Sequence, residues 1–337
     1  FLGLSEGTHY MDASAQMRKR PMGPLLKTLT GIGASFLFEG QDGHFPFAVT
    51  GAGLLIDTSD NEKKRIDVSV NINDSSQFLS ALLISLGAYA GESVIRVEGT
   101  HGMAYIDMTV RMMEQFGIKV QSENSVYKIA KQGGYKAKKY DIEPDVSAAC
   151  YFYAMAAILG VKSIVKGIHK DSMQGDIKFI YALERIGCVI TDKPEGLEVD
   201  GTSAVGYEGI DIDMSDFSDQ ALTMAVVAAF GKTETRIRNI GHIRGQESDR
   251  VQVIINELNR MGCDAKIVEE GGSTDVIITP GKLHGAEIET YDDHRVAMSF
   301  AVAGLAVDGI VIKNPMCCRK TFENYFDVLD TIEKEDE

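Results

Sequence analysis

Acidic residues that precede apolar helical segments recur at a nearly constant spacing in this chain. They are Asp74, Asp145, Asp219 and Asp293, which lie 71, 74 and 74 residues apart. Each is followed by a segment rich in small apolar residues, typical of a buried helix, then by a short β-like run and a second helix. A repeat of this kind, alternating helices and strands, predicts α/β units packed side by side around shared helices.

The ends of the second helices repeat as well. Three copies end in an apolar residue followed by glycine, at Phe116-Gly117, Ile186-Gly187 and Met261-Gly262. An equivalent pair, Ile32-Gly33, follows a helical segment that has no acidic residue before it. Glycine just beyond a helix is a common C-terminal signal. We therefore expect four helix ends of one type and a chain that starts inside a repeat, with residues 1–4 as the tail of a truncated helix.

The third and fourth copies can be divided into elements. In the third copy we expect helices at 147–159 and 176–186, a strand at 162–166, and paired strands at 188–190 and 197–199. The fourth copy has the same order, at 221–230, 234–238, 248–261, 265–268 and 276–279.

A domain boundary is expected in the polar stretch 140–144, because it contains Pro144 and proline cannot continue a strand ladder. We predict a first domain at 1–143, with one half unit and one full unit. The second domain would then span 144–337 and hold three units.

Composition argues against several classes of protein. The net charge is −15 over 337 residues, and a strongly negative surface does not suit nucleic acid or an anionic membrane as a partner. No apolar run reaches the roughly 20 residues that a membrane-spanning helix needs. Scattered cysteines, odd in number, indicate reduced thiols and a cytoplasmic compartment. They are Cys150, Cys188, Cys263, Cys317 and Cys318.

Positively charged residues gather where helices are expected to begin, at 18–20, 244–250, 292–295 and 319–321. Cations oppose the helix dipole at such positions, so helix formation alone does not favour them. In a chain of negative net charge they indicate a positive pocket for a phosphorylated or carboxylated ligand, with a solvated surface as the alternative for any one of them. Asp219 and Glu247 could exchange protons with such a ligand, although Asp219 would also suit helix capping.

Ser75, Ser76 and Gln77 offer two hydroxyls and an amide at another expected helix start. This group suits either a bound anion or plain capping, and both interpretations stay open. The seven histidines have no metal-binding spacing, and the sequence contains no phosphate-binding glycine loop or serine nucleophile motif. We therefore expect no metal and no cofactor.

Eight segments, taken in order, resemble the enolpyruvyl transferase family, and its shikimate branch in particular. They are Met17-Arg18-Lys19-Arg20-Pro21-Met22-Gly23, Asp74-Ser75-Ser76-Gln77-Phe78, Tyr105-Ile106-Asp107, Ser172-Met173-Gln174-Gly175-Asp176, Ser218-Asp219, Glu247-Ser248-Asp249-Arg250, Asp293-His294-Arg295-Val296-Ala297-Met298 and Lys320-Thr321-Phe322. The resemblance covers nearly the whole chain. It implies a two-domain α/β fold with three βαβαββ units in each domain and an active site in the cleft between them.

The resemblance also implies a reaction. The enolpyruvyl group of phosphoenolpyruvate would pass to the 5-hydroxyl of shikimate 3-phosphate through a tetrahedral adduct, a step of the shikimate pathway to aromatic amino acids. Both substrates are anionic, which would explain the cations, and two proton transfers are needed.

Roles for individual residues follow from their positions in the matching segments. Asp219 would be the base at the 5-hydroxyl, and Glu247 would join the proton transfers. Ser75, Ser76 and Gln77 would bind shikimate 3-phosphate, with Tyr105 nearby. The residues expected to grip phosphoenolpyruvate are Arg20, Arg250, Arg295 and Lys320.

The chain departs from the family pattern in three places. Gln246 stands where the family has a lysine that contacts both substrates, so hydrogen bonding is kept and the charge is lost. The segment 100–103 has no counterpart of a family serine. The family's N-terminal Lys-Ser pair, an arginine and an Asn-Gly-x-Gly-Thr loop would lie upstream of Phe1, so a separate N-terminal segment is an expected partner.

Two alternatives to this function stay open at this point. One is a truncated or degenerate homologue that binds anions without activity of its own. The other is the UDP-N-acetylglucosamine branch of the family, which has a cysteine where this chain has Ala15.

Overall fold

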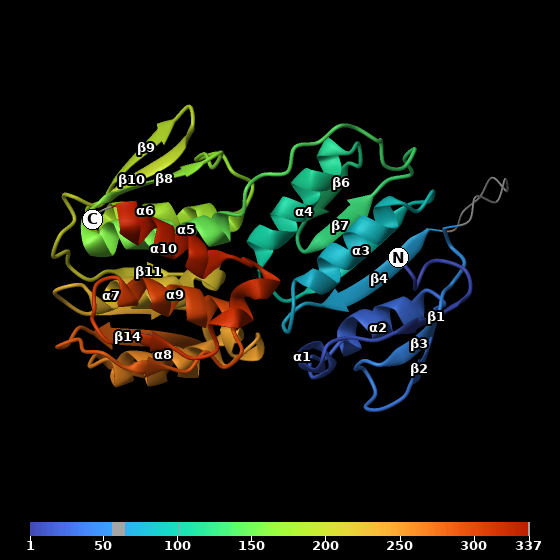
Figure 1. Ribbon diagram of the computed structural model, residues 1–337. Coiled ribbons are helices and arrows are strands. Elements are labelled where there is room, and N and C mark those ends of the chain that lie inside the picture. The colour runs from blue at the N-terminus through green and yellow to red at the C-terminus, as the bar shows by residue number, and fades with distance from the viewer. Residues whose placement is uncertain (56–64, 101, 336–337) are drawn as a thin grey trace. The chain divides into compact units, whose positions relative to one another are not determined.

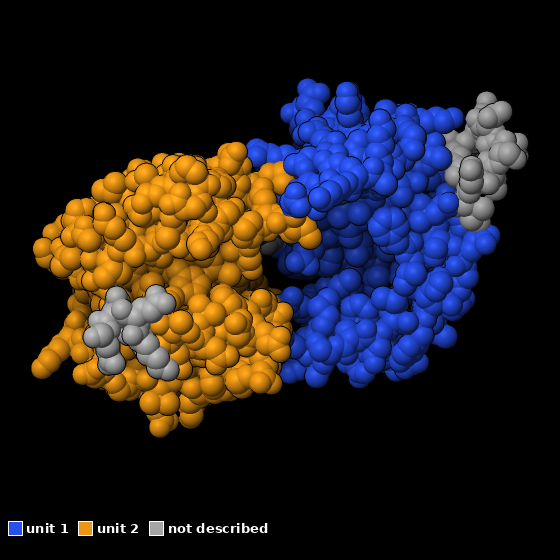
Figure 2. Space-filling view, turned by 45° about the horizontal axis from the view of Figure 1, so that its top comes forward, with its two compact units in different colours: residues 1–141 blue, residues 142–337 orange. Residues whose placement is uncertain are grey.

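A computed structural model describes residues 1–55, 65–100 and 102–335. The chain divides into two compact units, Phe1–Asp141 and Ile142–Glu337 (Figure 2). This division lies two residues before the boundary expected from the sequence. Both units mix helices and strands (Figure 1), which confirms the predicted α/β class. No helix in the described ranges is long and apolar enough to cross a membrane.

The first unit begins with a small antiparallel sheet in the order β1-β3-β2. Its elements are β1 (Thr8–Met11), α1 (Ala15–Arg18), α2 (Gly23–Gly31), β2 (Ser35–Phe38) and β3 (Phe47–Thr50). Residues 2–4 before β1 form a turn, in which the Leu4 and Ser5 amides donate to the Phe1 carbonyl, so the expected helical tail is wrong.

A complete βαβαββ unit follows in the first unit. It consists of β4 (Ile66–Asn71), α3 (Gln77–Gly87), β5 (Ser93–Glu98), α4 (Met103–Gln115), β6 (Val120–Glu123) and β7 (Val126–Ile129). The sheet order is β4-β5-β7-β6, with β4 and β5 parallel and the other pairs antiparallel. Leu79, Leu82, Leu83 and Leu86 of α3 pack into its core with Ile95 of β5.

The second unit contains the same arrangement once in full. It consists of β11 (Asp211–Asp213), η2 (Ser218–Gln220), α7 (Ala221–Ala229), β12 (Thr235–Arg238), η3 (Gly241–Gly245), α8 (Arg250–Arg260), β13 (Asp264–Glu270) and β14 (Ser273–Thr279). Its sheet order, β11-β12-β14-β13, matches that of the first unit strand for strand, with β11 and β12 parallel. The elements predicted for the fourth copy are therefore confirmed.

The flanking parts of the second unit carry shorter sheets. Before β11 come α5 (Val146–Leu159), β8 (Lys162–Lys166), η1 (Gly175–Lys178), α6 (Phe179–Arg185), β9 (Val189–Lys193) and β10 (Gly196–Asp200). After β14 come β15 (Glu287–Ile288), α9 (His294–Gly304), β16 (Val311–Ile312), η4 (Pro315–Lys320) and α10 (Tyr325–Glu335). The predicted pairing of the two strands around 194–196 is confirmed as β9 with β10.

Three helices, α5, α7 and α9, pack against one another at the centre of the second unit (Figure 1). Every residue of α7 is buried, because apolar and small side chains surround the whole helix rather than one face. The N-terminal ends of α5, α7 and α9 lie next to Asp145, Asp219 and Asp293, respectively. Asp145 and Asp293 cap their helices by accepting bonds from the Ala148 and Arg295 amides. The capping alternative for Asp219 is wrong, because Asp219 lies inside η2 and the N-cap of α7 is Gln220.

Two predicted helix starts are wrong. Asp74 does not cap α3, which begins at Gln77 after Ser76. Arg319 and Lys320 do not open a helix; they end η4, and α10 begins five residues after Lys320.

The four predicted helix ends are confirmed, and each is a Schellman turn. The glycines adopt left-handed backbone conformations, with φ of 109°, 89°, 105° and 100° at Gly33, Gly117, Gly187 and Gly262. The residue after each glycine donates its amide to a carbonyl in the last helical turn. These bonds are Ala34 to Leu29, Ile118 to Met113, Cys188 to Leu183 and Cys263 to Leu258.

Candidate functional site

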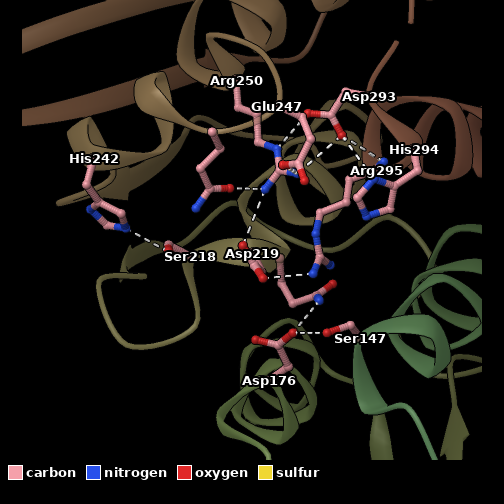
Figure 3. Close-up of polar contacts among 12 residues, drawn as sticks. Ser147, Asp176, Ser218, Asp219, His242, Glu247, Arg250, Asp293, His294 and Arg295 are labelled. Atoms are coloured by element: carbon pink, nitrogen blue, oxygen red, sulfur yellow. Dashed lines mark hydrogen bonds and ion pairs between the residues drawn. The ribbon is translucent and has the colours of Figure 1, made fainter. Parts of the chain in front are cut away.

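A buried arginine, Arg250, lies at the centre of a cluster of charged residues in the second unit (Figure 3). It is the first residue of α8, whose N-cap is Asp249. Its side chain is 2% exposed. A guanidinium has five N–H donors, and five hydrogen bonds occupy them here. The acceptors belong to Asp219, Gln246, Glu247 and Asp293, with two bonds to Asp293.

Asp293 is the most buried partner of Arg250. Its Oδ2 accepts from Arg250 Nε at 2.8 Å and from Ser248 Oγ at 2.9 Å. Its Oδ1 accepts from Arg250 Nη2 at 3.2 Å and from the Arg295 amide at 3.0 Å. Burial alone would raise the pKa of this carboxyl, but the adjacent Arg250 charge and these bonds lower its pKa to about 2. Asp293 is therefore ionised, and it joins the first turn of α9 to α8.

Asp219 bridges two arginines. Its Oδ1 lies 3.3 Å from Arg250 Nη1, and its Oδ2 lies 2.8 Å from Arg295 Nη2. The short helix η2 carries Asp219 to the start of the buried helix α7. A carboxylate between two cations is favoured in its charged form.

Glu247 links Arg250 to a lysine from a distant part of the chain. Its Oε2 accepts from Arg250 Nη2 at 2.8 Å, and its Oε1 lies 3.7 Å from Lys320 Nζ. Gln246, beside it in the chain, accepts a bond from Arg250 Nη1 through Oε1. Since arginine offers only donors, the oxygen of the Gln246 amide has to face Arg250 and its NH₂ group faces away.

The structure thus brings together all six of the predicted site residues that belong to the second unit. They are Asp219, Gln246, Glu247, Arg250, Arg295 and Lys320. We call these six, with Asp293, the Arg250 cluster. The pocket was expected to be positive, but each of its three cations is paired with a carboxylate, because charges removed from water need partners.

Sequence reasoning gave no role to Asp176, a buried carboxyl next to this cluster. It accepts a hydrogen bond from Ser147 and one from Gln220 Nε2 at 2.9 Å. Burial, with the nearby charge of Asp219, raises its pKa above the usual range. Gln220 directly follows Asp219, so Asp176 helps to hold η2 in place (Figure 3). The sequence feature that could have identified Asp176 is its position within the matching segment 172–176.

Two histidines of the second unit were also missed as neighbours of the site. His242 Nε2 lies 2.7 Å from Ser218 Oγ, next to Asp219. Burial, followed by the charge of Arg295, lowers the pKa of His294 to about 4, so this ring is neutral at pH 7. For His294 the sequence signal was its position in the matching segment 293–298, whereas His242 lies in none of the matching segments.

The remaining predicted residues belong to the first unit. Ser75 Oγ accepts from the Gln77 amide at 3.3 Å, which gives α3 a capping contact at its start. Ser76 is buried and Tyr105, on α4, is half-buried. Both lie against Gly102, where an added Cβ would stand 2.5 Å from Ser76 Oγ and 3.4 Å from Tyr105 Cδ2. Arg20 lies between α1 and α2.

One segment singled out from the sequence cannot be placed in full. The stretch 100–103, where a family serine has no counterpart, includes His101, which is outside the described residues. Within the described ranges, no group of three or more His, Cys, Asp or Glu side chains is arranged to hold a metal ion.

Comparison with known proteins gives one consistent result. The family model for EPSP synthase (3-phosphoshikimate 1-carboxyvinyltransferase) matches residues 1–329. The chain is 41% identical to the 3-phosphoshikimate 1-carboxyvinyltransferase of Nostoc punctiforme, over 96% of this chain and 73% of that protein. It is 36% identical to the protein of that name from Marinomonas, over 98% of this chain and 75% of the relative.

A solved structure agrees with these relatives. The EPSP synthase of Acinetobacter baumannii superposes with a TM-score of 0.76 at 25% identity, covering 98% of this chain and 74% of that chain. The likeness extends across nearly all of the sequence.

Proposed function

Because the chain belongs to the EPSP synthase (3-phosphoshikimate 1-carboxyvinyltransferase) family, we propose that it transfers the enolpyruvyl group of phosphoenolpyruvate to the 5-hydroxyl of shikimate 3-phosphate. The products would be the enolpyruvyl ether and inorganic phosphate. The predicted enolpyruvyl transferase fold is confirmed by the solved relative. The names of the relatives argue against the UDP-N-acetylglucosamine branch and against a homologue without activity.

The observation that carries this proposal is the Asp219 carboxylate held between Arg250 and Arg295. An entering carboxylate or phosphate offers these arginines a new partner, and bidentate arginine contacts suit either group. If Arg295 turns to the ligand, Asp219 loses one of the two charges that favour its ionised form and becomes a better base.

Asp219 takes the proton of the 5-hydroxyl while the hydroxyl oxygen attacks C2 of phosphoenolpyruvate, and the protonated form of Glu247 delivers its proton to C3. In the resulting adduct the C2–O bond to phosphate breaks, the methyl group returns one proton to Glu247 as the C2–C3 double bond forms again, and Asp219 passes its proton to the departing phosphate. Glu247 suits the step that takes a proton back because it bridges Arg250 and Lys320, two cations that stabilise its carboxylate form. An anion bound at Lys320 offsets this charge and favours the protonated form that the first step needs.

Lys320 and Arg295 are proposed to bind phosphoenolpyruvate, together with Arg250 and Arg20. Gln246 contributes its outward NH₂ group as a neutral donor to a substrate. For the first unit we propose that Ser75, Ser76 and Gln77 bind shikimate 3-phosphate, with Tyr105 close by. Hydroxyls at a helix start, beside the amides of the first turn, suit a phosphate group.

The test is phosphate release with both substrates present and with each omitted in turn. The assay uses the chain by itself and the chain joined to the part of the Nostoc relative that it does not match. Phosphate release that needs both substrates is expected. Failure of the joined protein to release phosphate, in a folded sample, would refute the proposed reaction.

A further inference from the structure

The backbone just before α9 is strained. Tyr291 and Asp292 are consecutive and both have positive φ, 54° and 56°. Residues other than glycine rarely adopt this left-handed conformation, and such strain persists only where surrounding contacts hold it in place. The next residue, Asp293, belongs to the Arg250 cluster, and Arg295 follows two positions later.

A buried carboxylate on α8 holds this segment. Glu257 is 0% exposed. Its Oε1 accepts from the Tyr291 hydroxyl at 2.8 Å, and its Oε2 accepts from the Glu289 amide at 3.1 Å. Asn256 Nδ2 donates to the same Tyr291 hydroxyl at 3.2 Å.

The second strained residue is held from another direction. Asn314 Nδ2 donates to Asp292 Oδ1 at 3.3 Å. Asn314 is the N-cap of η4, which ends at Lys320. The strained pair is therefore bonded to α8, which carries Arg250, and to the N-cap of η4, which carries Lys320.

Glu257 follows Arg250 by seven residues, which is about two turns of one helix, so both side chains project from the same face of α8. Arg250 binds Asp293 and Glu257 binds the segment 289–291. The helix α8 thus contacts the segment before α9 at two points. Glu257 binds residues 289 and 291, and Arg250 binds Asp293, which follows the strained pair.

We propose that Tyr291 and Glu257 are positioning residues, which set the orientation of Asp293 and Arg295 in the Arg250 cluster through the strained turn. Neither side chain needs to touch a substrate. The proposal deepens the proposed function, since the ligand affected is the phosphoenolpyruvate assigned to Arg295 and Lys320.

The test compares Tyr291→Phe with Tyr181→Phe. Tyr291 is 40% exposed and Tyr181, on α6 in the same unit, is 45% exposed, so both variants lose a hydroxyl from a ring of similar exposure. Kinetics measure KM for each substrate and kcat. Hydrogen exchange of the segment 287–298, without substrates, measures whether the entry to α9 loosens.

We expect Tyr291→Phe to raise KM for phosphoenolpyruvate about fivefold to tenfold, which corresponds to about 1 kcal/mol at fivefold and about 1.4 kcal/mol at tenfold. KM for shikimate 3-phosphate should be unchanged. Exchange should accelerate in 287–298 only, and Tyr181→Phe should match the wild type in every measurement. Glu257→Gln should have a similar effect, and combining it with Tyr291→Phe should add less than the two single effects.

Three results would overturn the proposal. They are unchanged kinetics and exchange in Tyr291→Phe, an equal rise in both KM values with a lowered Tm, and full additivity in the double variant. These kinetics use the chain joined to the unmatched part of the Nostoc relative. If that protein without substitutions is folded and shows no turnover, the proposed reaction fails, and hydrogen exchange still decides whether Tyr291 and Glu257 position the turn.

Discussion

Arg250 and Asp293 meet through two parallel hydrogen bonds, from Nε to Oδ2 at 2.8 Å and from Nη2 to Oδ1 at 3.2 Å. Both side chains are almost fully buried. Loss of one member of such a pair leaves an uncompensated buried charge, which typically costs about 3–5 kcal/mol. Asp293→Asn should therefore lower the free energy of unfolding at pH 7 by an amount of this order, measured by urea denaturation.

The same pair predicts a loss of stability in acid. The pKa of Asp293 is about 2 in the folded protein and about 3.9 in an unfolded chain. The stabilisation is fully present above pH ~4 and is lost as pH falls toward 2, on the order of 2 kcal/mol in total. Unfolding free energies at pH 5, 4, 3 and 2 should fall less steeply in Asp293→Asn. Parallel slopes would contradict this assignment.

His294 predicts a second pH dependence, in a different range. Its pKa is lowered to about 4 in the folded protein, against about 6.5 when unfolded. Between these values the unfolded chain binds a proton that the folded chain does not, so stability is complete above pH ~6.5 and declines as pH falls to 4. His294→Asn should lose that decline. An NMR titration that puts the His294 pKa near 6.5 would refute it.

Asp219→Ala should abolish turnover and leave the fold intact. Removal of a general base typically costs about 10²–10⁴-fold in rate, and Arg295 would lose its carboxylate partner. The matched control is Asp216→Ala, which removes an exposed carboxylate paired with Lys178. Circular dichroism verifies the fold, and phosphate release measures turnover. Activity close to wild type in Asp219→Ala would remove this residue from the mechanism.

Gln246→Lys is expected to impair the site. The lysine of the family pattern at this position would suggest a gain of activity or phosphoenolpyruvate affinity, if the site were a weakened form of the family's. The structure favours the opposite, because Gln246 accepts a bond from Arg250 and a lysine would offer only donors and a like charge. KM for phosphoenolpyruvate should rise and Tm should fall. A gain in affinity would show that the Arg250 bond is dispensable.

The Schellman turns predict a stability difference between two glycines of the second unit. Gly262 has φ of 100°, and an added Cβ would stand 2.5 Å from the Lys282 carbonyl oxygen. Gly262→Ala should therefore destabilise the protein by about 1–3 kcal/mol. Gly245→Ala is the control, since an added Cβ there meets nothing within 4 Å. Equal Tm values for the two variants would contradict the prediction.

The sequence predicted these turns because a left-handed position restricts residue choice, so Ile32-Gly33 and its three counterparts carry a local signal. It also predicted the chain segments that supply the Arg250 cluster. The contacts between these segments could not be predicted from the sequence. Asp219, Arg250 and Asp293 lie 31 and 43 residues apart, and their contacts depend on how α7, α8 and α9 pack. The helix start predicted at Asp74 was wrong because the spacing of Asp74 matches the repeat, whereas α3 begins only at Gln77.

The Arg250 cluster joins three cations, Arg250, Arg295 and Lys320, to three carboxylates, those of Asp219, Glu247 and Asp293. Its formal charge is therefore zero before a substrate enters. An anion that binds there leaves the cluster with surplus negative charge, which raises the proton affinity of its carboxylates. Capture of the anion and uptake of a proton from solvent are thus thermodynamically linked. The buffer dependence of the binding enthalpy would reveal this linkage before any bond is made or broken.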